Sequence, residues 1–423
     1  MSGEERADTT TRRRPAWLTA PVLTVSVLSI AAGIAQFGVT TVIGDVAATF
    51  GEPGVGDEAI DQIGLPATTV GVALMIIRLA SLGSLPAAAL ADRVGRRTVL
   101  LTMAALGLAL TSLSSLAPSF WWYVALVAFA RPALTTLNAV AGVVAAEESR
   151  AVDRSAALAL IAAAYGLGSG IVAVGRGLLP GEPSFRLVMA FALIPLLLLP
   201  LLARKIREPK IVSDDRRAIG VPGRVPRRYL GRVALLAALT GTVALATGPG
   251  FTFLFVYGER VLGASPLFLS VLVLSAGPIG LVGILLGRWA ADRFGRRIAA
   301  GIAMALTGAS VAVAYSDGVV ALAIGYLGAL AASSGFAPPA GALVAELVPT
   351  RVRATVAGWE TIAGVLGASL GLLSFGVIAD LTTGFDSAAM LIGIVVAVVA
   401  VGFVWLPETL GTELEDLEEA ENT

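Results

Sequence analysis

The chain has 423 residues, of which 56 % are hydrophobic and 14 % charged, and its formal net charge is zero. Since soluble domains carry roughly 25 % charged residues, this composition indicates a protein that lies in a lipid bilayer. The absence of cysteine and histidine excludes disulfides, thiolate or imidazole metal sites and catalysis by a thiol or an imidazole. We therefore expect no enzymatic activity, no metal, no cofactor and no nucleic-acid partner.

Twelve apolar stretches are long enough to cross a membrane as helices, which takes about 20 residues each. The first follows a polar, arginine-containing start. It exceeds the roughly 7–15 residues of a signal-peptide core, so we expect it to stay as a membrane helix. The twelve stretches, in chain order, are 17–43, 66–90, 98–117, 120–145, 155–179, 185–203, 231–257, 266–287, 297–315, 318–344, 354–379 and 387–406.

These stretches predict an all-α membrane protein with two bundles of six helices. If the N-terminus is cytoplasmic, 25 of the 30 basic residues fall on the cytoplasmic side, as the positive-inside rule requires. We therefore expect a multi-pass protein of the cell (inner or plasma) membrane with both termini cytoplasmic. Three basic residues are assigned to the outer side, namely Arg176, Arg186 and Arg260. The expected parts are a tail at 1–16, the first bundle at 17–203, a linker at 204–230, the second bundle at 231–406 and an acidic tail at 407–423.

An internal repeat relates the two bundles. The segment 92–97 reads DRVGRR, and the segment 292–297 reads DRFGRR, 200 residues later. Further charged residues recur at offsets of 199 or 200. This common register indicates a duplicated six-helix unit. The recurring pairs are Glu147 with Glu346, Arg154 with Arg353 and Glu208 with Glu408.

The two hexapeptides, each after the second helix of its bundle, resemble the loop signature of the major facilitator superfamily of secondary transporters. The resemblance covers essentially the whole chain. Two stretches, Ala345–Arg353 and Leu406–Leu414, are similar to its branch of sugar porters and organic-ion transporters. The resemblance implies two pseudo-symmetric six-helix bundles that move a small molecule across the bilayer by alternating access, with protons as a coupling ion. We expect the chain to act as a monomer.

The same resemblance implies a cytoplasmic gate, in which charged helix ends interlock when that side is closed. The alternative is a set of solvated interfacial charges, each pair contributing about 0–1 kcal/mol. The residues that the resemblance assigns to the gate are Asp92, Arg93, Arg96, Arg97, Glu147, Arg154, Glu208, Asp292, Arg293, Arg296, Arg297, Glu346, Arg353 and Glu408.

Three ionisable residues lie well inside predicted helices, where each costs a few kcal/mol to insert. Arg78 is a candidate for substrate or counter-ion contact, or a structural arginine that reaches backbone carbonyls. Arg131 resembles the superfamily's arginine on the fourth helix, and Asn138 shares its face two turns on; the alternative role is support of the gate. Glu360 lies about 10 Å into the membrane, which suits proton coupling, and the alternative is a fixed ion pair.

Four further residues are candidates by their position in the predicted helices. Asp45, near the outer end of the first helix, is assigned to an outer gate or to proton uptake at the mouth. Gln36 lies deeper in the same helix. Tyr165 and Trp359, on the fifth and eleventh helices, are further candidates for the substrate site.

The charges of the predicted site favour one substrate class. Two buried arginines against one buried glutamate favour a small organic anion, because arginine pairs strongly with carboxylates. Proton-driven efflux of drugs or lipophiles, and sugar uptake, are the alternatives. A non-transporting receptor on the same scaffold has no extra domain or long loop to support it.

Overall fold

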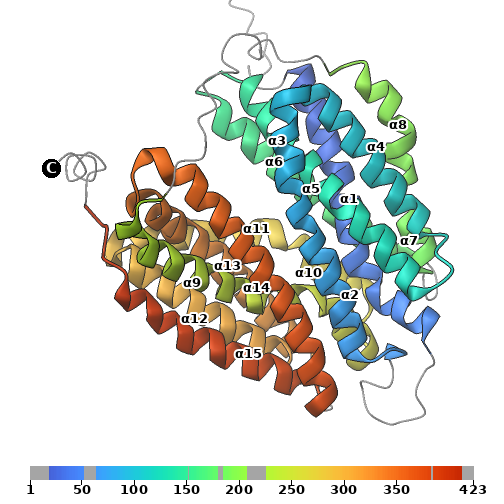
Figure 1. Ribbon diagram of the computed structural model, residues 1–423. Coiled ribbons are helices and arrows are strands. Elements are labelled where there is room, and N and C mark those ends of the chain that lie inside the picture. Colours follow the sequence, from blue (N-terminus) through green and yellow to red (C-terminus); the bar gives the residue numbers. More distant parts are fainter. Residues whose placement is uncertain are drawn as a thin grey trace, which may run out of the picture.

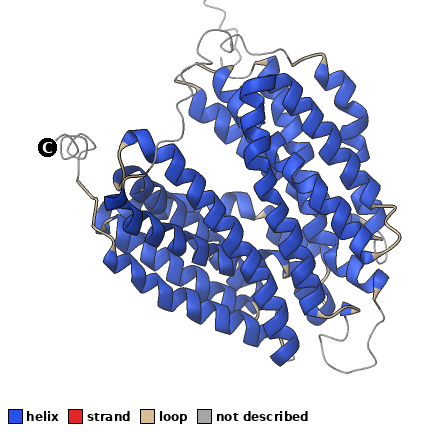
Figure 2. Ribbon diagram, in the orientation of Figure 1, coloured by secondary structure: helices blue, strands red, loops and turns tan. Residues whose placement is uncertain are grey.

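The structure, a computed structural model, describes residues 19–51, 63–150, 152–179, 184–206, 225–382 and 384–411. Helices and turns make up these residues, and none of them lies in a strand (Figure 2). Twelve helical segments are long and apolar enough to cross a membrane, which confirms the prediction of a twelve-helix membrane protein. Glu208, the N-terminal tail and most of the linker and acidic tail lie outside the described residues.

The first half of the chain supplies six spans, two of which are broken within the membrane. They are α1 (Ala20–Phe50), α2 (Ala67–Ala80) continued through the 3₁₀ turn η2 (Ser81–Gly83) into α3 (Ser84–Val94), α4 (Arg96–Ser114), α5 (Phe120–Glu147), α6 (Arg154–Leu178), and α7 (Phe185–Ala190) followed by α8 (Leu193–Ala203).

The second half repeats this order with its own local irregularities. It comprises α9 (Arg227–Thr252) with the π-helical turn η4 (Val256–Val261), α10 (Pro266–Leu274) followed by α11 (Ala276–Phe294), α12 (Arg296–Ala314), α13 (Val319–Glu346), the 3₁₀ turn η5 (Thr350–Val352), α14 (Arg353–Thr382), and α15 (Phe385–Val399) with the 3₁₀ turn η6 (Ala400–Trp405).

The first helix differs from its prediction at its C-terminal end. The sequence places that end at residue 43, before the polar pair Gly44-Asp45, whereas α1 continues to Phe50. The helix continues because the Asp45 side chain is buried and paired with arginine rather than solvated. Asp45 therefore lies within the helix, more than one turn before its end.

The two copies of the hexapeptide adopt the same structure. Each forms the tight connection between two antiparallel spans, α3 with α4 and α11 with α12. Gly95 and Gly295 stand at the turn with φ values of 109° and 98°, a region that glycine enters at little steric cost. The internal repeat read from the sequence thus has a structural counterpart.

The two halves touch at one end of the molecule and separate toward the other (Figure 1). We call the separated end the basic end, because Arg96, Arg204, Arg296 and Arg353 lie there, and the opposite end the far end. The halves meet where α2 packs on α14, α6 on α10 and α1 on η4. These pairs confine the contact between the halves to the far end and the middle of the spans.

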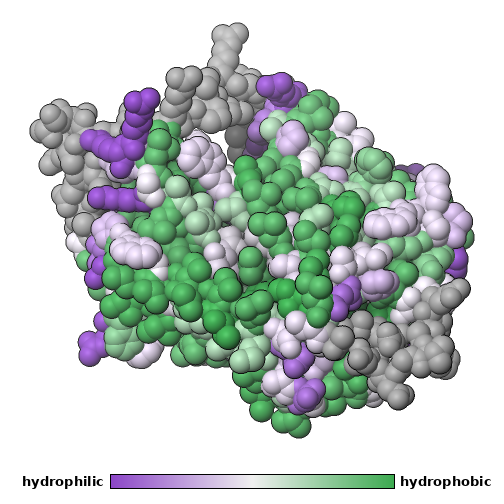
Figure 3. Space-filling model, turned by 60° about the horizontal axis from the view of Figure 1, so that its bottom comes forward, coloured by the Kyte–Doolittle hydropathy of each residue, from purple (hydrophilic) through white to green (hydrophobic). Residues whose placement is uncertain are grey.

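Packing within each half relies on small residues, as expected where lipid gives helices no hydrophobic reason to associate. Gly33 and Gly168 bring α1 against α6, and Gly241 and Gly367 bring α9 against α14, with backbone on backbone. Large apolar side chains such as Leu197 remain exposed. They contribute to the hydrophobic surface over the spans (Figure 3), which suits contact with lipid tails.

Candidate functional site

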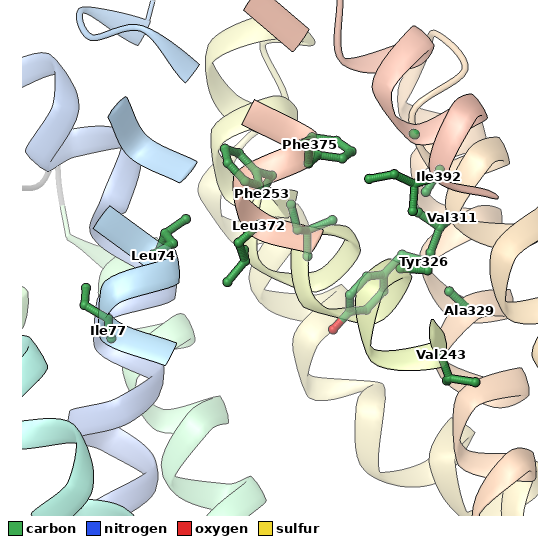
Figure 4. Packing of buried hydrophobic residues seen from close by; sticks show 14 of the residues in the cluster. Leu74, Ile77, Val243, Phe253, Val311, Tyr326, Ala329, Leu372, Phe375 and Ile392 are labelled. Atoms are coloured by element: carbon green, nitrogen blue, oxygen red, sulfur yellow. The ribbon is translucent and has the colours of Figure 1, made fainter. Parts of the chain in front are cut away.

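A cavity of about 280 Å³ lies between the two halves, midway along the spans. The first half lines it with residues of α1, α2, α5 and α6, and the second half with residues of α9 and α14. Leu74 on α2 and Leu372 on α14 face each other across this boundary (Figure 4). Because both halves contribute, any relative motion of the halves changes the cavity.

Arg78 and Arg131 are the charged residues of the cavity wall. The Nε atom of each is buried and has no hydrogen-bond partner among the described residues. Over the described part of the chain, no carboxylate lines the cavity. Two cations therefore line the cavity without a fixed counter-charge, which is costly where burial lowers the dielectric constant and favours a bound anion.

Local breaks in two helices position these arginines. The helix α2 ends two residues after Arg78, where the Ser81 hydroxyl donates to the Arg78 carbonyl at 2.6 Å. Pro132 follows Arg131 inside α5 and cannot donate the usual backbone bond. Gly83 of η2 leaves room for the Pro132 ring. The two irregularities therefore lie against each other beside the arginines.

The predicted substrate-site residues fall into two groups. Gln36, Arg78, Arg131 and Tyr165 line the cavity. The other members lie elsewhere. Trp359 is 39 % exposed, and Asn138 and Glu360 each keep a buried side-chain oxygen without a partner. Asn138 is seven residues, and therefore about 10 Å, nearer the basic end than Arg131, while Glu360 lies beside Thr240 of α9. The members outside the cavity are Asn138, Trp359 and Glu360.

A network of four charged side chains closes the far end. Arg176 of α6 donates to Asp45 of α1, with its Nη2 2.8 Å from Oδ2, and also pairs with Glu259 of η4. Arg260 of η4 donates to Asp45 at 3.1 Å. Since α1 and α6 belong to one half and η4 to the other, two of these contacts join the halves.

Sequence reasoning assigned Arg176 and Arg260 to the outer side but gave neither a role, and the structure places both in this network. Arg176 lies in the last turn of α6 and is 2 % exposed, and Arg260 lies in η4. The glutamate at 259 was not singled out at all. An arginine at the end of an apolar helix can indicate a buried ion pair. Its two partners, however, come from helices far away in the sequence, so the sequence does not identify them.

A second contact between the halves at the far end uses main-chain donors. The Asp380 carboxylate of α14 accepts the backbone N–H of Ala67 at 2.9 Å and that of Thr68 at 2.7 Å. These are the first residues of α2, whose N–H groups have no partner within the helix. Gly376, one turn before Asp380, lets the backbones of α14 and α2 approach closely.

The family follows from comparison with known proteins. The model of the Major Facilitator Superfamily matches residues 25–290 and 278–422. The chain belongs to this superfamily. No curated protein matches the sequence.

Solved structures of other superfamily members share this fold at low sequence identity. The inward-open xylose transporter XylE from E. coli superposes with a TM-score of 0.73 at 17 % identity, covering 94 % of this chain and 98 % of that one. A bacterial homologue of the human lysosomal transporter Spinster, inward-facing and occupied, gives 0.71 at 17 % identity, covering 96 % and 99 %. The nucleoside transporter NupG (D323A mutant) gives 0.70 at 13 % identity, covering 91 % and 99 %.

At the basic end of this superfamily member, the predicted gate residues pair within each half. Arg96 contacts Glu147 at 2.7 Å, and its counterpart Arg296 contacts Glu346 at 3.6 Å. Arg97 donates to carbonyls at the end of α8, and Arg297 to carbonyls after α15. Each of these contacts joins residues of the same half. Seven other predicted gate residues within the described ranges also lie at the basic end. They are Asp92, Arg93, Arg154, Asp292, Arg293, Arg353 and Glu408.

Proposed function

We propose that this protein is a secondary transporter that moves a small organic anion across the membrane by alternating access. The observation that carries the proposal is the cavity between the halves in which Arg78 and Arg131 have no carboxylate partner among the described residues. An anion neutralises both guanidinium groups and supplies the acceptors that their N–H groups lack. Direct contact of both halves with this cavity is what alternating access requires.

The basic residues set the proposed orientation. Because cytoplasmic segments of membrane proteins are enriched in arginine and lysine, the basic end is cytoplasmic. The conformation is then closed on the outside, by the Arg176 network and Asp380, and its halves are apart on the cytoplasmic side. Asp45 accordingly acts in the outer gate.

Removing either cavity arginine is expected to weaken anion binding. Loss of a charged hydrogen bond costs about 1.5–3 kcal/mol, so Arg78→Ala and Arg131→Ala should each raise the dissociation constant roughly 10- to 100-fold. The measurement is calorimetric titration of the purified protein with a panel of carboxylates. Arg186→Ala is the matched control, because Arg186 bonds the Ser115 carbonyl away from the cavity. Unchanged anion affinity in both cavity variants would contradict the proposal.

We further propose that Glu360 couples transport to protons. Its buried Oε1 has no hydrogen-bond partner among the described residues. Glu360 lies eight residues before the cavity residue Ala368 on α14, about 12 Å nearer the basic end. Glu360→Gln should keep anion exchange but lose uptake driven by a proton gradient in proteoliposomes. Glu148→Gln, at the end of α5, is the control. Gradient-driven uptake that survives in Glu360→Gln would assign the coupling elsewhere.

The charged pairs at the basic end are proposed to interlock the halves when that side closes. Arg96 pairs with both Asp92 and Glu147 within the first half, and closure would bring this group to the start of α14. Asp92→Asn should therefore favour the inward-facing state. A cysteine in the cavity should then react faster with a maleimide applied from the cytoplasmic side, and an unchanged rate would argue against the interlock.

Sugar uptake is the second candidate function. It is favoured by the uncharged donors Gln36 and Tyr165 in the cavity wall and by the structural likeness to a xylose transporter. A neutral sugar would leave both arginines without an anionic partner, so the positive charge of the cavity favours an anionic substrate over a sugar. Xylose belongs in the same titration panel. Binding of xylose with no binding of any anion would reverse the order of the two proposals.

A further inference from the structure

The two walls of the cavity differ in the hydrogen-bond donors that they offer. The first half presents side chains that carry N–H or O–H groups, beside the apolar Phe37, Val39, Leu74 and Ile77. Among the described residues, none of these side chains has a hydrogen bond or an ion pair with another protein group. This wall can therefore surround an anionic group with donors. The donors are Gln36, Thr40, Arg78, Arg131 and Tyr165.

The wall from the second half contains hydroxyl groups whose protons are already used. The Thr247 hydroxyl donates to the Val243 carbonyl at 3.2 Å, and the Thr252 hydroxyl donates to the Gly248 carbonyl at 2.6 Å. Both hydroxyls can still accept a hydrogen bond but have no proton left to give. A second carboxylate lying against this wall would meet no free donor.

Apolar groups make up the rest of the second wall. Phe251, Ala368 and Leu372 line the cavity from α9 and α14. The Phe251 ring is held edge-on against Tyr326, with 5.5 Å between the ring centroids and 76° between the planes. A rigid aromatic face and two aliphatic side chains favour contact with an apolar body.

We propose that the substrate is an amphipathic organic anion with a single anionic group and an apolar, preferably aromatic, body. The proposal rests on the anion-transport function above and names the substrate class for the same cavity. The anionic group binds the donors of the first half, and the body lies against Phe251 and Leu372. A dicarboxylate or a polyhydroxylated acid would place unpaired polar groups against the second wall, at a cost of about 1–3 kcal/mol for each buried group.

In this arrangement Phe251 selects the apolar body of the substrate and takes no part in recognising its charge. The anion remains with the first half, while the body contacts the half that moves relative to it. The contribution of the apolar body to affinity then depends on Phe251 and Leu372 of the second half. The contribution of the anionic group depends on the donors of the first half. Variants in the two walls should therefore affect different parts of the ligand.

The test is calorimetric titration of the purified full-length protein with four probes as sodium salts or neutral solutes. They are phenylacetate, succinate, gluconate and the neutral phenylacetamide. We expect phenylacetate to bind at least about tenfold more tightly than succinate or gluconate, and phenylacetamide not to bind measurably. If no anion binds, the transport proposal itself fails. If succinate or gluconate binds as tightly as phenylacetate, anion binding stands and the inferred substrate class is wrong.

Variants in the second wall complete the test. Phe251→Ala should weaken phenylacetate binding about tenfold and leave succinate unaffected, whereas Phe251→Leu, which keeps an apolar side chain, should lose less. Phe129→Ala is the control, because this phenylalanine is 72 % exposed and does not line the cavity, and phenylacetate affinity should stay within about twofold. A tenfold loss in Phe129→Ala, or equal losses for phenylacetate and succinate in Phe251→Ala, would overturn the inference.

Discussion

Replacement of Arg176 by methionine is expected to open the far end and to lower the stability of the closed state by about 3–5 kcal/mol, the cost of breaking a buried ion pair. Methionine roughly fills the volume but leaves Asp45 and Glu259 buried without the cation that they share. Arg260 still reaches Asp45, so Glu259 loses the most. Outward opening hydrates both carboxylates and thereby relieves the cost.

The measurement uses a single cysteine at Thr40 in the cavity wall, since the natural chain contains no other cysteine. A membrane-impermeant maleimide applied to intact cells should label this cysteine at least tenfold faster in Arg176→Met. Arg176→Lys should give an intermediate rate, because the charge is kept but the two-pronged geometry is lost. The control is Arg150→Met, an exposed arginine paired with Asp153 within one half. Equal labelling rates in Arg176→Met and the control would show that the network does not hold the far end closed.

Asp380→Ala is expected to shift the protein toward the outward-open state by about 0.5–2 kcal/mol, the usual cost of losing a helix N-cap. At about 1.4 kcal/mol for each factor of ten, the outward-open population rises between twofold and thirtyfold. The carboxylate also lies at the positive end of the α2 dipole, which adds to the loss. The same labelling of a cysteine at residue 40 reports the change.

Two variants separate capping from a general effect of charge at this end. Asp380→Asn keeps an oxygen that accepts one of the two N–H groups, so its labelling rate should lie between those of the wild type and the alanine variant. Asp386→Ala removes a carboxylate from the first turn of α15, at the same end of the bundle, and should label like the wild type. Identical rates for all three variants would mean that Asp380 contributes nothing to closure.

The fold could be predicted from the sequence because its determinants are local. A run of apolar residues inserts as a helix whatever its neighbours are, and the repeated hexapeptide fixes the relation of the two bundles. Arg78 and Arg131 could be selected for a similar reason, since an arginine within an apolar run is costly wherever it faces. The break of α2 just after Arg78 and the extension of α1 beyond residue 43 were not predictable, because both depend on contacts with other helices.

The far-end network shows where such reasoning stops. Three members of the network lie at the ends of apolar runs, namely Arg176, Glu259 and Arg260. At the end of such a run, the sequence looks the same whether the charged side chain is exposed on the surface or buried between helices. Only the packing of α6 and η4 against α1 decides between these cases. Conversely, Glu360 and Asn138 stand out in the sequence, yet both lie outside the cavity wall because α5 and α14 line the cavity with residues nearer the far end.

Asp380 differs from the other closing contacts in the identity of its partner, which is the peptide backbone of Ala67 and Thr68. Every amino acid except proline supplies that N–H group. An evolutionary comparison of homologues should therefore find the acidic residue retained with no residue type at position 67 or 68 changing in step with it. Methods that infer contacts from correlated substitutions would miss this one, although it joins the two halves of the molecule.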